Sequence, residues 1–270
     1  MKKTSVIILF LISSLTFKAA DTLKIFYYSN FPFAYKENGV IKGIDVDIIK
    51  EYEKFSKEKK AIDLITTYTE YTDLDKFQSD LKSASKNVVG IGGITYTKAR
   101  STNFNFTSAY LKNVSVLVCH GNIPTIRSTN STDIKASLDK MTAITVKNST
   151  HETYVNDLKK SMPTLKVEFE ANLQDVLKKI EANKTGFGYV DLIAYWAYSK
   201  KMKEGSYLKI QRLLNKGDET FSMILPKNEV MAGHLNEFFD SGFGFTSTKL
   251  YHEILSKYLG YEVLESVEVN

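Results

Sequence analysis

Few residues in this sequence stand at spacings that could support catalysis or metal binding. His151-Glu152 begins like the H-E-x-x-H motif of zinc hydrolases, but Val155 stands where the second histidine would be, so the motif is absent. Asp45 and Asp47 are one residue apart and could share a metal ion. Both precede a helix-like stretch, where an acid suits the positive end of the helix dipole, so we expect capping and solvation instead.

Other chemical signatures are missing from the sequence as well. It contains no G-x-S-x-G nucleophile motif and no P-loop, and Gly90, Gly92 and Gly93 have the wrong spacing for a dinucleotide fingerprint. The single cysteine, Cys119, excludes an internal disulfide and a multi-cysteine zinc site, and its apolar surroundings predict a buried thiol. We therefore expect no metal, no cofactor and no enzymatic activity.

Length and composition indicate a globular protein that does not bind nucleic acid. The chain has 270 residues, of which 43% are hydrophobic and 25% are charged, which suffices for one large domain or for two lobes. The net charge is +5, and the lysines are interleaved with acids rather than gathered on one basic face. We expect a monomer whose main partner is a small molecule.

Residues 1–20 have the pattern of a cleavable secretory signal peptide. Lys2 and Lys3 precede an apolar run from Val6 to Leu15, which is too short to span a bilayer comfortably, and Ala19-Ala20 follow it. No cysteine follows the run, so we do not expect a lipoprotein. Cleavage after residue 20 would remove three lysines, lower the net charge from +5 to +2 and release a soluble protein into the periplasm. An uncleaved anchor is the alternative.

Strand-like and helix-like segments alternate along the rest of the chain. Short β-branched or aromatic runs predict strands, and apolar residues at helical spacing predict helices between them. This alternation favours an α/β fold with mostly parallel sheets that are covered on both faces. The expected strands are 23–28, 61–68, 88–94, 110–119, 142–146, 165–169, 186–190 and 221–225, and helices are expected after Gly43, from Leu74, from Thr150 and after Asn172.

Four landmarks occur in a fixed order along the chain. They are N-F-P-F-A-Y at 30–35, G-I-D-V-D at 43–47, G-G-I-T-Y-T-K-A-R followed by N-F-N-F-T-S-A-Y within 92–110, and Asp191 after a hydrophobic strand. In this order and approximate spacing they resemble bacterial periplasmic solute-binding protein family 3, the substrate-binding proteins of polar amino-acid ABC importers. The resemblance covers nearly the whole chain after residue 20.

The resemblance implies a two-lobe periplasmic binding protein fold of type II, with a ligand cleft between lobes that are joined by two crossover strands. Lobe 1 would comprise residues 21–111 and 216–270, and lobe 2 would comprise residues 112–215. It also implies that the protein captures a small polar ligand, in this family an amino acid, by hinge closure and delivers it to an inner-membrane ABC permease.

The resemblance assigns ligand-binding roles in the first lobe. In this family an arginine five residues after a threonine clamps the ligand carboxylate, and Arg100 follows Thr95 at that spacing. A guanidinium group matches a carboxylate bidentately, which a lysine cannot do. Gly92, Gly93 and Thr95 correspond to the family's backbone and hydroxyl donors. The alternative for Arg100 is a surface position in the turn or helix after the strand.

In the second lobe the resemblance points to Ser149 and Thr150 as ligand contacts at a helix amino terminus. Helix capping is their alternative role, and the two roles are compatible. The family's ammonium ligand, a carboxylate after the last strand of this lobe, corresponds to Asp191, whose alternative is again an N-cap. His151 follows Thr150 directly, where it could line the cleft or lie at a solvated helix start, and we expect the second.

Two departures from the family pattern leave the identity of the ligand open. Asn30 stands where the family often has an aromatic residue against the ligand side chain, so either Phe31 or Tyr28 compensates or the pocket is more polar. Asn148 replaces a frequent glycine before the Ser/Thr pair. A ligand that is not an amino acid therefore stays open.

Two other functions fit the same scaffold. Some relatives of this family are exported dehydratases, and here His151 and Asp191 are the only candidates for a general acid or base. A ligand-presenting sensory module is the second alternative, although no signalling segment in the sequence supports it.

Overall fold

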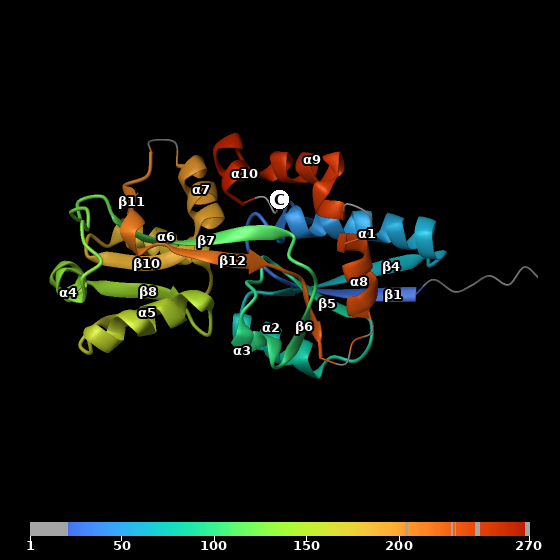
Figure 1. Cartoon of the computed structure of the whole chain (residues 1–270), viewed down its shortest axis with the longest axis horizontal. Helices are drawn as coiled ribbons and strands as arrows, with labels where there is room; N and C mark the ends of the chain where they lie inside the picture. Colours follow the sequence, from blue (N-terminus) through green and yellow to red (C-terminus); the bar gives the residue numbers. More distant parts are fainter. Residues whose placement is uncertain (1–20, 203–204, 228, 230, 241–243, 268–270) are drawn as a thin grey trace, which may run out of the picture.

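Two helix-covered sheets lie side by side and are connected by long strands (Figure 1). This computed structural model describes residues 21–202, 205–227, 229, 231–240 and 244–267. The signal peptide predicted at 1–20 lies outside the described residues. The α/β fold class is confirmed, and we call the part around the five-stranded sheet the first lobe and the part around the six-stranded sheet the second lobe.

The sheet of the first lobe has the strand order β4-β1-β5-β13-β6. Strand β1 runs parallel to β4 and β5, because helices carry the chain back between them, whereas β13 pairs antiparallel with β5 and β6. The strands are β1 (Asp21–Tyr28), β4 (Leu64–Tyr71), β5 (Val88–Ile91), β6 (Phe104–Phe106) and β13 (Ile224–Pro226), with a separate hairpin of β2 (Tyr35–Glu37) and β3 (Val40–Lys42).

The sheet of the second lobe has the order β11-β7-β10-β8-β9, with β12 also paired to β7. Strands β8, β9 and β10 are parallel, and β7 runs antiparallel to its neighbours. Both sheets are therefore mixed, where the sequence pattern predicted mostly parallel ones. The strands are β7 (Leu111–His120), β8 (Thr142–Val146), β9 (Lys166–Glu170), β10 (Gly186–Asp191), β11 (Leu208–Ile210) and β12 (Lys216–Phe221).

Strands β7 and β12 pass between the two lobes as an antiparallel pair (Figure 1). They pair from Leu111 opposite Phe221 to Ser115 opposite Lys216, with a shift in register between Lys216 and Glu219. One strand carries the chain into the second lobe and the other carries it back, which explains why the two run antiparallel. Such narrow connections permit the lobes to move relative to each other.

Helices cover both sheets, and several begin at the predicted caps. Ser149 accepts a hydrogen bond from the backbone N–H of Glu152, and Asn172 accepts one from Asp175, so both predicted N-caps are confirmed. The helices are α1 (Ile44–Lys60), α2 (Leu74–Ser83), α3 (Lys98–Ser101), α4 (Ser131–Leu138), α5 (Thr150–Ser161), α6 (Leu173–Ala182), α7 (Leu192–Lys201), α8 (Met231–Asp240), α9 (Lys249–Tyr258) and α10 (Tyr261–Val267), with 3-10 turns at Arg212–Leu214 and Phe245–Ser247.

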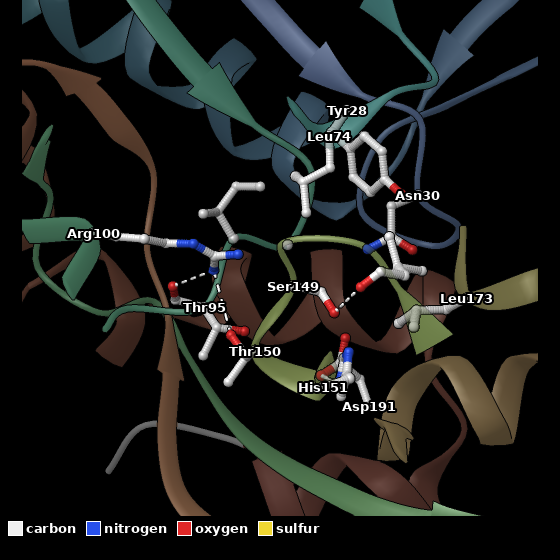
Figure 2. A pocket seen from close by; sticks show the side chains of 13 residues that line it. Tyr28, Asn30, Leu74, Thr95, Arg100, Ser149, Thr150, His151, Leu173 and Asp191 are labelled. Carbon is white, nitrogen blue, oxygen red and sulfur yellow. Dashed lines mark hydrogen bonds and ion pairs between the residues drawn. The ribbon is translucent and has the colours of Figure 1, made fainter. Parts of the chain in front are cut away.

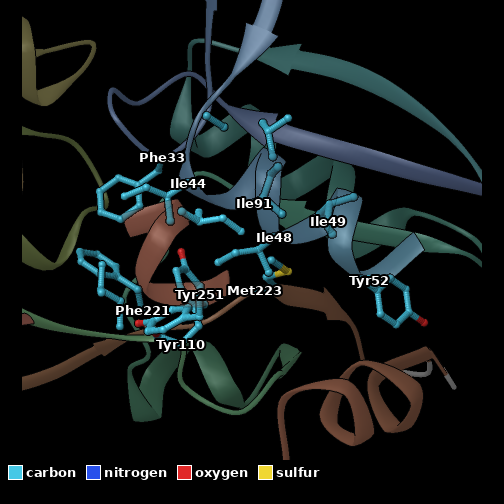
Figure 3. Packing of buried hydrophobic residues seen from close by; sticks show 14 of the residues in the cluster. Phe33, Ile44, Ile48, Ile49, Tyr52, Ile91, Tyr110, Phe221, Met223 and Tyr251 are labelled. Carbon is cyan, nitrogen blue, oxygen red and sulfur yellow. The ribbon is translucent and has the colours of Figure 1, made fainter. Parts of the chain in front are cut away.

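The core of the first lobe forms where α1 packs on the sheet (Figure 3). Helix α1 buries Ile48, Ile49 and Tyr52 on one face, as its apolar spacing predicted. Cys119 is buried and free in the second lobe, which confirms its interpretation as a core residue. Among the described residues, no helix combines the length and the apolar character that a membrane span requires.

Candidate functional site

A pocket lies between the two lobes, and both lobes contribute to its lining (Figure 2). The space open to the centre of a water-sized molecule is about 40 Å³, and the empty space reaches about 400 Å³ when the open mouth is counted. It brings together the residues that the resemblance assigned to the ligand, except Gly92 and Phe31. The first lobe contributes Tyr28, Asn30, Leu74, Gly93, Ile94, Thr95 and Arg100, and the second lobe contributes Val146, Ser149, Thr150, His151, Leu173 and Asp191.

Arg100 enters the pocket from α3, whose N-cap Thr97 accepts a hydrogen bond from the backbone N–H of Arg100. Its guanidinium donates to the Thr95 carbonyl oxygen at 3.0 Å, the Thr150 hydroxyl at 3.4 Å and the Asn148 carbonyl oxygen at 3.4 Å. All of these partners within the described residues are neutral oxygens. Burial lowers the pKa of Arg100, and the more distant Asp191 carboxylate opposes that shift.

Asp191 occupies the N-cap position of α7, but its side chain makes no capping hydrogen bond. Oδ1 instead accepts from Nδ2 of Asn113 at 2.6 Å and lies 3.2 Å from Nε2 of His151. The carboxylate is only 3% exposed, and the described residues offer no hydrogen bond to Oδ2. The capping interpretation of the Asp191 side chain is therefore wrong, and one carboxylate oxygen is left available.

His151 is buried in the first turn of α5, with 4% of its surface exposed. The sequence predicted a solvated histidine at a helix start, and that prediction is wrong. The partner that draws the ring inward is Asp191, which is 40 positions further along the chain. A local pattern cannot reveal such a contact.

Ser149 and Thr150 begin α5 at the pocket. The Ser149 hydroxyl donates to the Val146 carbonyl oxygen at 2.6 Å and accepts from the Glu152 N–H at 3.1 Å, so capping occupies this hydroxyl. The Thr150 hydroxyl accepts from Arg100, which joins the two lobes. Asn148, just before them, has a left-handed φ of 54°, which asparagine tolerates better than most residues and which explains the frequent glycine at this position.

The two glycines after β5 do not offer free N–H donors. Gly92 and Gly93 donate to Oδ2 of Asp45 at 2.7 and 3.0 Å. Asp45 is 1% exposed, so its predicted solvated role is wrong, and burial raises its pKa to about 6. Gly93 still lines the pocket at a φ of 67°, where an added Cβ would come within 2.5 Å of the Phe33 ring. Only glycine fits this position.

Asn30 lies in the pocket and Phe31 does not. The Asn30 amide donates to the Gly92 carbonyl oxygen at 3.0 Å, which ties the loop after β1 to the loop after β5. Phe31 stacks edge-on against Tyr35, with centroids 4.8 Å apart, and Nζ of Lys201 lies 3.6 Å from its ring centroid. The predicted contribution of Phe31 to the pocket wall is therefore not observed, and Tyr28, its alternative, lines the pocket instead.

Sequence reasoning missed the apolar half of the lining. Leu74 and Leu173 are the first residues of α2 and α6, and each follows its N-cap directly. The sequence pattern predicted the start of a helix at each of them and no ligand contact, and both belong to one buried cluster. Ile94 and Val146 stand beside predicted site residues but carry no polar signal. The described residues contain no group of three or more histidines, cysteines or acids placed to hold a metal ion.

The site thus presents a cation and an anion to one pocket from opposite lobes. Arg100 comes from the first lobe and Asp191 from the second, and each has unused hydrogen-bonding capacity. A molecule that carries both a carboxylate and an ammonium group would complement both side chains.

Comparison with known proteins identifies the family. The sequence model of the bacterial extracellular solute-binding proteins, family 3, matches residues 23–260. No curated protein matches the chain in sequence.

Solved structures share this fold at low sequence identity. An ancestral arginine-binding protein bound to arginine is 21% identical with a TM-score of 0.69, over 88% of this chain and 98% of that one. The arginine-, lysine-, histidine-binding protein ArtJ from Geobacillus stearothermophilus is 20% identical with a TM-score of 0.68, over 91% and 99%. The ancestral amino acid-binding protein AncCDT-1, a precursor of cyclohexadienyl dehydratase, is 18% identical with a TM-score of 0.62, over 88% and 94%. These likenesses confirm the type II two-lobe fold.

Proposed function

We propose that this chain, which belongs to family 3 of the bacterial extracellular solute-binding proteins, captures an α-amino acid by closure of its two lobes. A solute-binding role is what the family supports, and the ligand class rests on the site. The observation that carries it is the placement of Arg100 and Asp191 in one pocket, one from each lobe. Arg100 binds the ligand carboxylate and Oδ2 of Asp191 binds its ammonium group.

The other predicted residues complete the ligand frame. The carbonyl oxygen of Thr95 and the hydroxyl oxygen of Thr150 hold the guanidinium group of Arg100 in place. The hydroxyl of Thr95 donates to the ligand carboxylate. Ser149 and Gly93 shape the pocket rather than bind the ligand through free donors, because the Ser149 hydroxyl and the Gly93 N–H already have partners within the protein. Asn30 uses one amide hydrogen on the Gly92 carbonyl oxygen, so its second amide hydrogen and Oδ1 are available to a ligand.

Lobe 1 comprises 21–111 and 216–270, and lobe 2 comprises 112–215, in this proposal. The pairing of β7 with β12 at the crossing supports these limits. Two contacts between the lobes support a closed form: the Tyr28 hydroxyl donates to the Ala171 carbonyl oxygen at 2.7 Å, and Lys147 lies 3.4 Å from Asp75.

We further propose that the protein is exported and delivers its ligand to a transporter. The predicted signal peptide at 1–20 and the extracellular character of the family support export to the periplasm. There the protein would act as a monomer and pass its ligand to an inner-membrane ABC permease.

The decisive experiment identifies the ligand directly. Freshly purified protein is denatured, and the released small molecules are analysed by mass spectrometry; calorimetry then measures the affinity of the candidate. An α-amino acid at near-stoichiometric amount supports the proposal. A sugar or a plain carboxylate, or failure of every amino acid to bind, contradicts it.

Catalysis is the second candidate, and one observation favours it. His151 and Asp191 are in contact and both buried in the pocket, as an acid–base pair would be. AncCDT-1, which shares the fold, is a precursor of a dehydratase. Proton NMR of the bound ligand over hours separates the two functions, because a binding protein returns its ligand unchanged.

A further inference from the structure

The pocket wall made by Tyr28, Leu74, Asn30 and Leu173 carries no charge. In Figure 2, Arg100 enters from one side, and Tyr28, Leu74, Asn30 and Leu173 lie on the other. Of the thirteen lining residues, Arg100 and Asp191 are the only arginine, lysine or carboxylate side chains, and His151 already contacts Asp191. We propose that the pocket selects an α-amino acid with a short, uncharged side chain, in the class of alanine, serine, threonine and valine.

This inference rests on the proposed function, because it needs both charges to be taken up by the two α-groups of the ligand. Once Arg100 holds the carboxylate and Asp191 holds the ammonium group, a third charge on the ligand has no counterion in the lining. A buried charge without a partner loses its hydration without compensation. Lysine, arginine, aspartate and glutamate are therefore disfavoured.

The length limit comes from the wall formed by Tyr28. Its ring lines the pocket, and its hydroxyl donates to the Ala171 carbonyl oxygen in the opposite lobe at 2.7 Å. Tyr28 is 6% exposed, and it belongs to the same buried cluster as Leu74 and Leu173. A side chain that reached beyond this wall would break the contact between the lobes and oppose closure.

Arginine is the charged amino acid that is hardest to exclude, because acids lie near the pocket and could attract its long side chain. A second depression shares Leu74 and Val146 with the pocket, is lined by Ala171, the acceptor of the Tyr28 hydroxyl, and contains three acids. Two of them already have lysine partners: Asp75 lies 3.4 Å from Lys147, and Glu170 lies 2.6 Å from Lys179. The third, Asp73, caps α2 by accepting from the Lys76 N–H. A long cation would have to pass Leu74 and Val146, which line both depressions, to reach any of them.

Calorimetry with a panel of amino acids tests the selection on the wild-type protein. Alanine, serine, threonine and valine are compared with arginine, lysine and glutamate. We expect at least one of the first group to bind about 100-fold or more tightly than every charged amino acid, which corresponds to about 2.7 kcal/mol. Tighter binding of arginine or glutamate overturns the inference and leaves the proposed function intact. If no amino acid binds, the proposed function falls and the inference falls with it.

Variants of the wall test the length limit. Tyr28→Ala removes the ring that closes this end of the pocket. The affinity for leucine or methionine should therefore improve by about 10-fold relative to the affinity for alanine as ligand. Tyr28→Phe keeps the ring and loses only the hydrogen bond between the lobes, so it should weaken all ligands by a similar factor and keep their ratio. Leu173→Ala enlarges the same end and serves if Tyr28→Ala does not fold. If Tyr28→Ala and Leu173→Ala fold but bind leucine and methionine no better relative to alanine than the wild type does, the proposed wall is contradicted.

Discussion

The side-chain amide of Asn113 donates to Oδ1 of Asp191 at 2.6 Å and thereby ties a crossover strand to the ligand pocket. The same Nδ2 also donates to Oε2 of Glu219 on the other crossover strand, at 3.2 Å. Glu219 further accepts from the hydroxyls of Ser115 and Tyr154. The strands that connect the lobes are thus linked to each other and to the proposed ammonium site by one polar network, which is buried at Asn113, Ser115 and Asp191 and partly buried at Glu219.

Glu219→Gln should destabilise the protein by about 1–3 kcal/mol, because the hydrogen bonds that Glu219 accepts from Asn113, Ser115 and Tyr154 lose the assistance of its negative charge. Urea unfolding followed by circular dichroism measures the change. Glu253→Gln serves as the matched control, since Glu253 forms only an exposed i,i+4 pair with Lys249, and it should change stability by less than about 0.5 kcal/mol. Equal effects of the two substitutions would argue against the network.

Arg100→Lys should weaken ligand binding severely and leave the fold intact. Lysine keeps the charge but loses the bidentate match to a carboxylate, and loss of a charge-assisted pair in a buried site costs about 2–5 kcal/mol, or roughly 30- to 4000-fold in affinity. Calorimetry with the identified ligand gives the change. Arg127→Lys is the control, because Arg127 is exposed and outside the pocket. Near-wild-type affinity in Arg100→Lys would remove Arg100 from the site.

Asp191→Asn should distinguish classes of ligand. The neutral amide of the variant cannot form an ion pair with the α-ammonium group of the ligand, so the affinity for an amino acid falls. The affinity for a sugar or a plain carboxylate should change only mildly. Titrations of wild type and variant measure the ratio. Asp157→Asn, on the exposed end of a surface pair with Lys160, should leave affinity unchanged. No loss of affinity for a confirmed amino acid would refute the role of Asp191.

Local signals in the sequence predicted the secondary structure well and its long-range contacts poorly. The caps at Ser149 and Asn172 depend on residues three positions away, and both predictions are confirmed. Asp45 and His151 were both assigned to solvated helix starts and are both buried. Their partners, Gly92 and Asp191, are about 40 or more positions away, beyond any local pattern.

The polar part of the candidate site could be predicted because the family resemblance fixes polar residues at recognisable spacings. The apolar part could not, since Leu74 and Leu173 look the same in sequence whether they face a core or a pocket. In the structure they do both: they belong to a buried cluster and also line the pocket. The placement of Phe31 was also beyond reach, because it depends on Lys201 in the other lobe.

Ligand should bring the lobes together and stabilise the protein. A ligand that joins Arg100 in one lobe to Asp191 in the other binds the closed form better than the open one, and this difference shifts the population. Binding also stabilises the native state, by about 2.7 kcal/mol at a hundredfold excess over Kd. Small-angle scattering should show a smaller radius of gyration with ligand, and calorimetry a higher melting temperature. A higher melting temperature without compaction would indicate a rigid, preformed pocket.

The buried carboxyl of Asp45 should make stability depend on pH. Burial raises its pKa in the folded protein from 3.8 to about 6, so between these values the folded state binds more protons than the unfolded state. Its contribution to stability is therefore fully present below about pH 4 and is lost as the pH rises through about 6, by roughly 3 kcal/mol in total.

Asp45→Asn removes this titration and keeps an oxygen that can accept from Gly92 and Gly93. Unfolding free energies of both proteins, measured in urea between about pH 4 and pH 7, should show the variant gaining on the wild type as the pH rises, because only the wild type carries the buried charge above pH 6. Other carboxyl groups titrate in the same range, but they contribute equally to both proteins and cancel in the difference. Asp63→Asn, at an exposed aspartate in the same lobe, should show no such trend. A constant difference between wild type and Asp45→Asn across this range would mean that Asp45 is ionised in the folded protein at little cost, and that the two N–H donors outweigh burial.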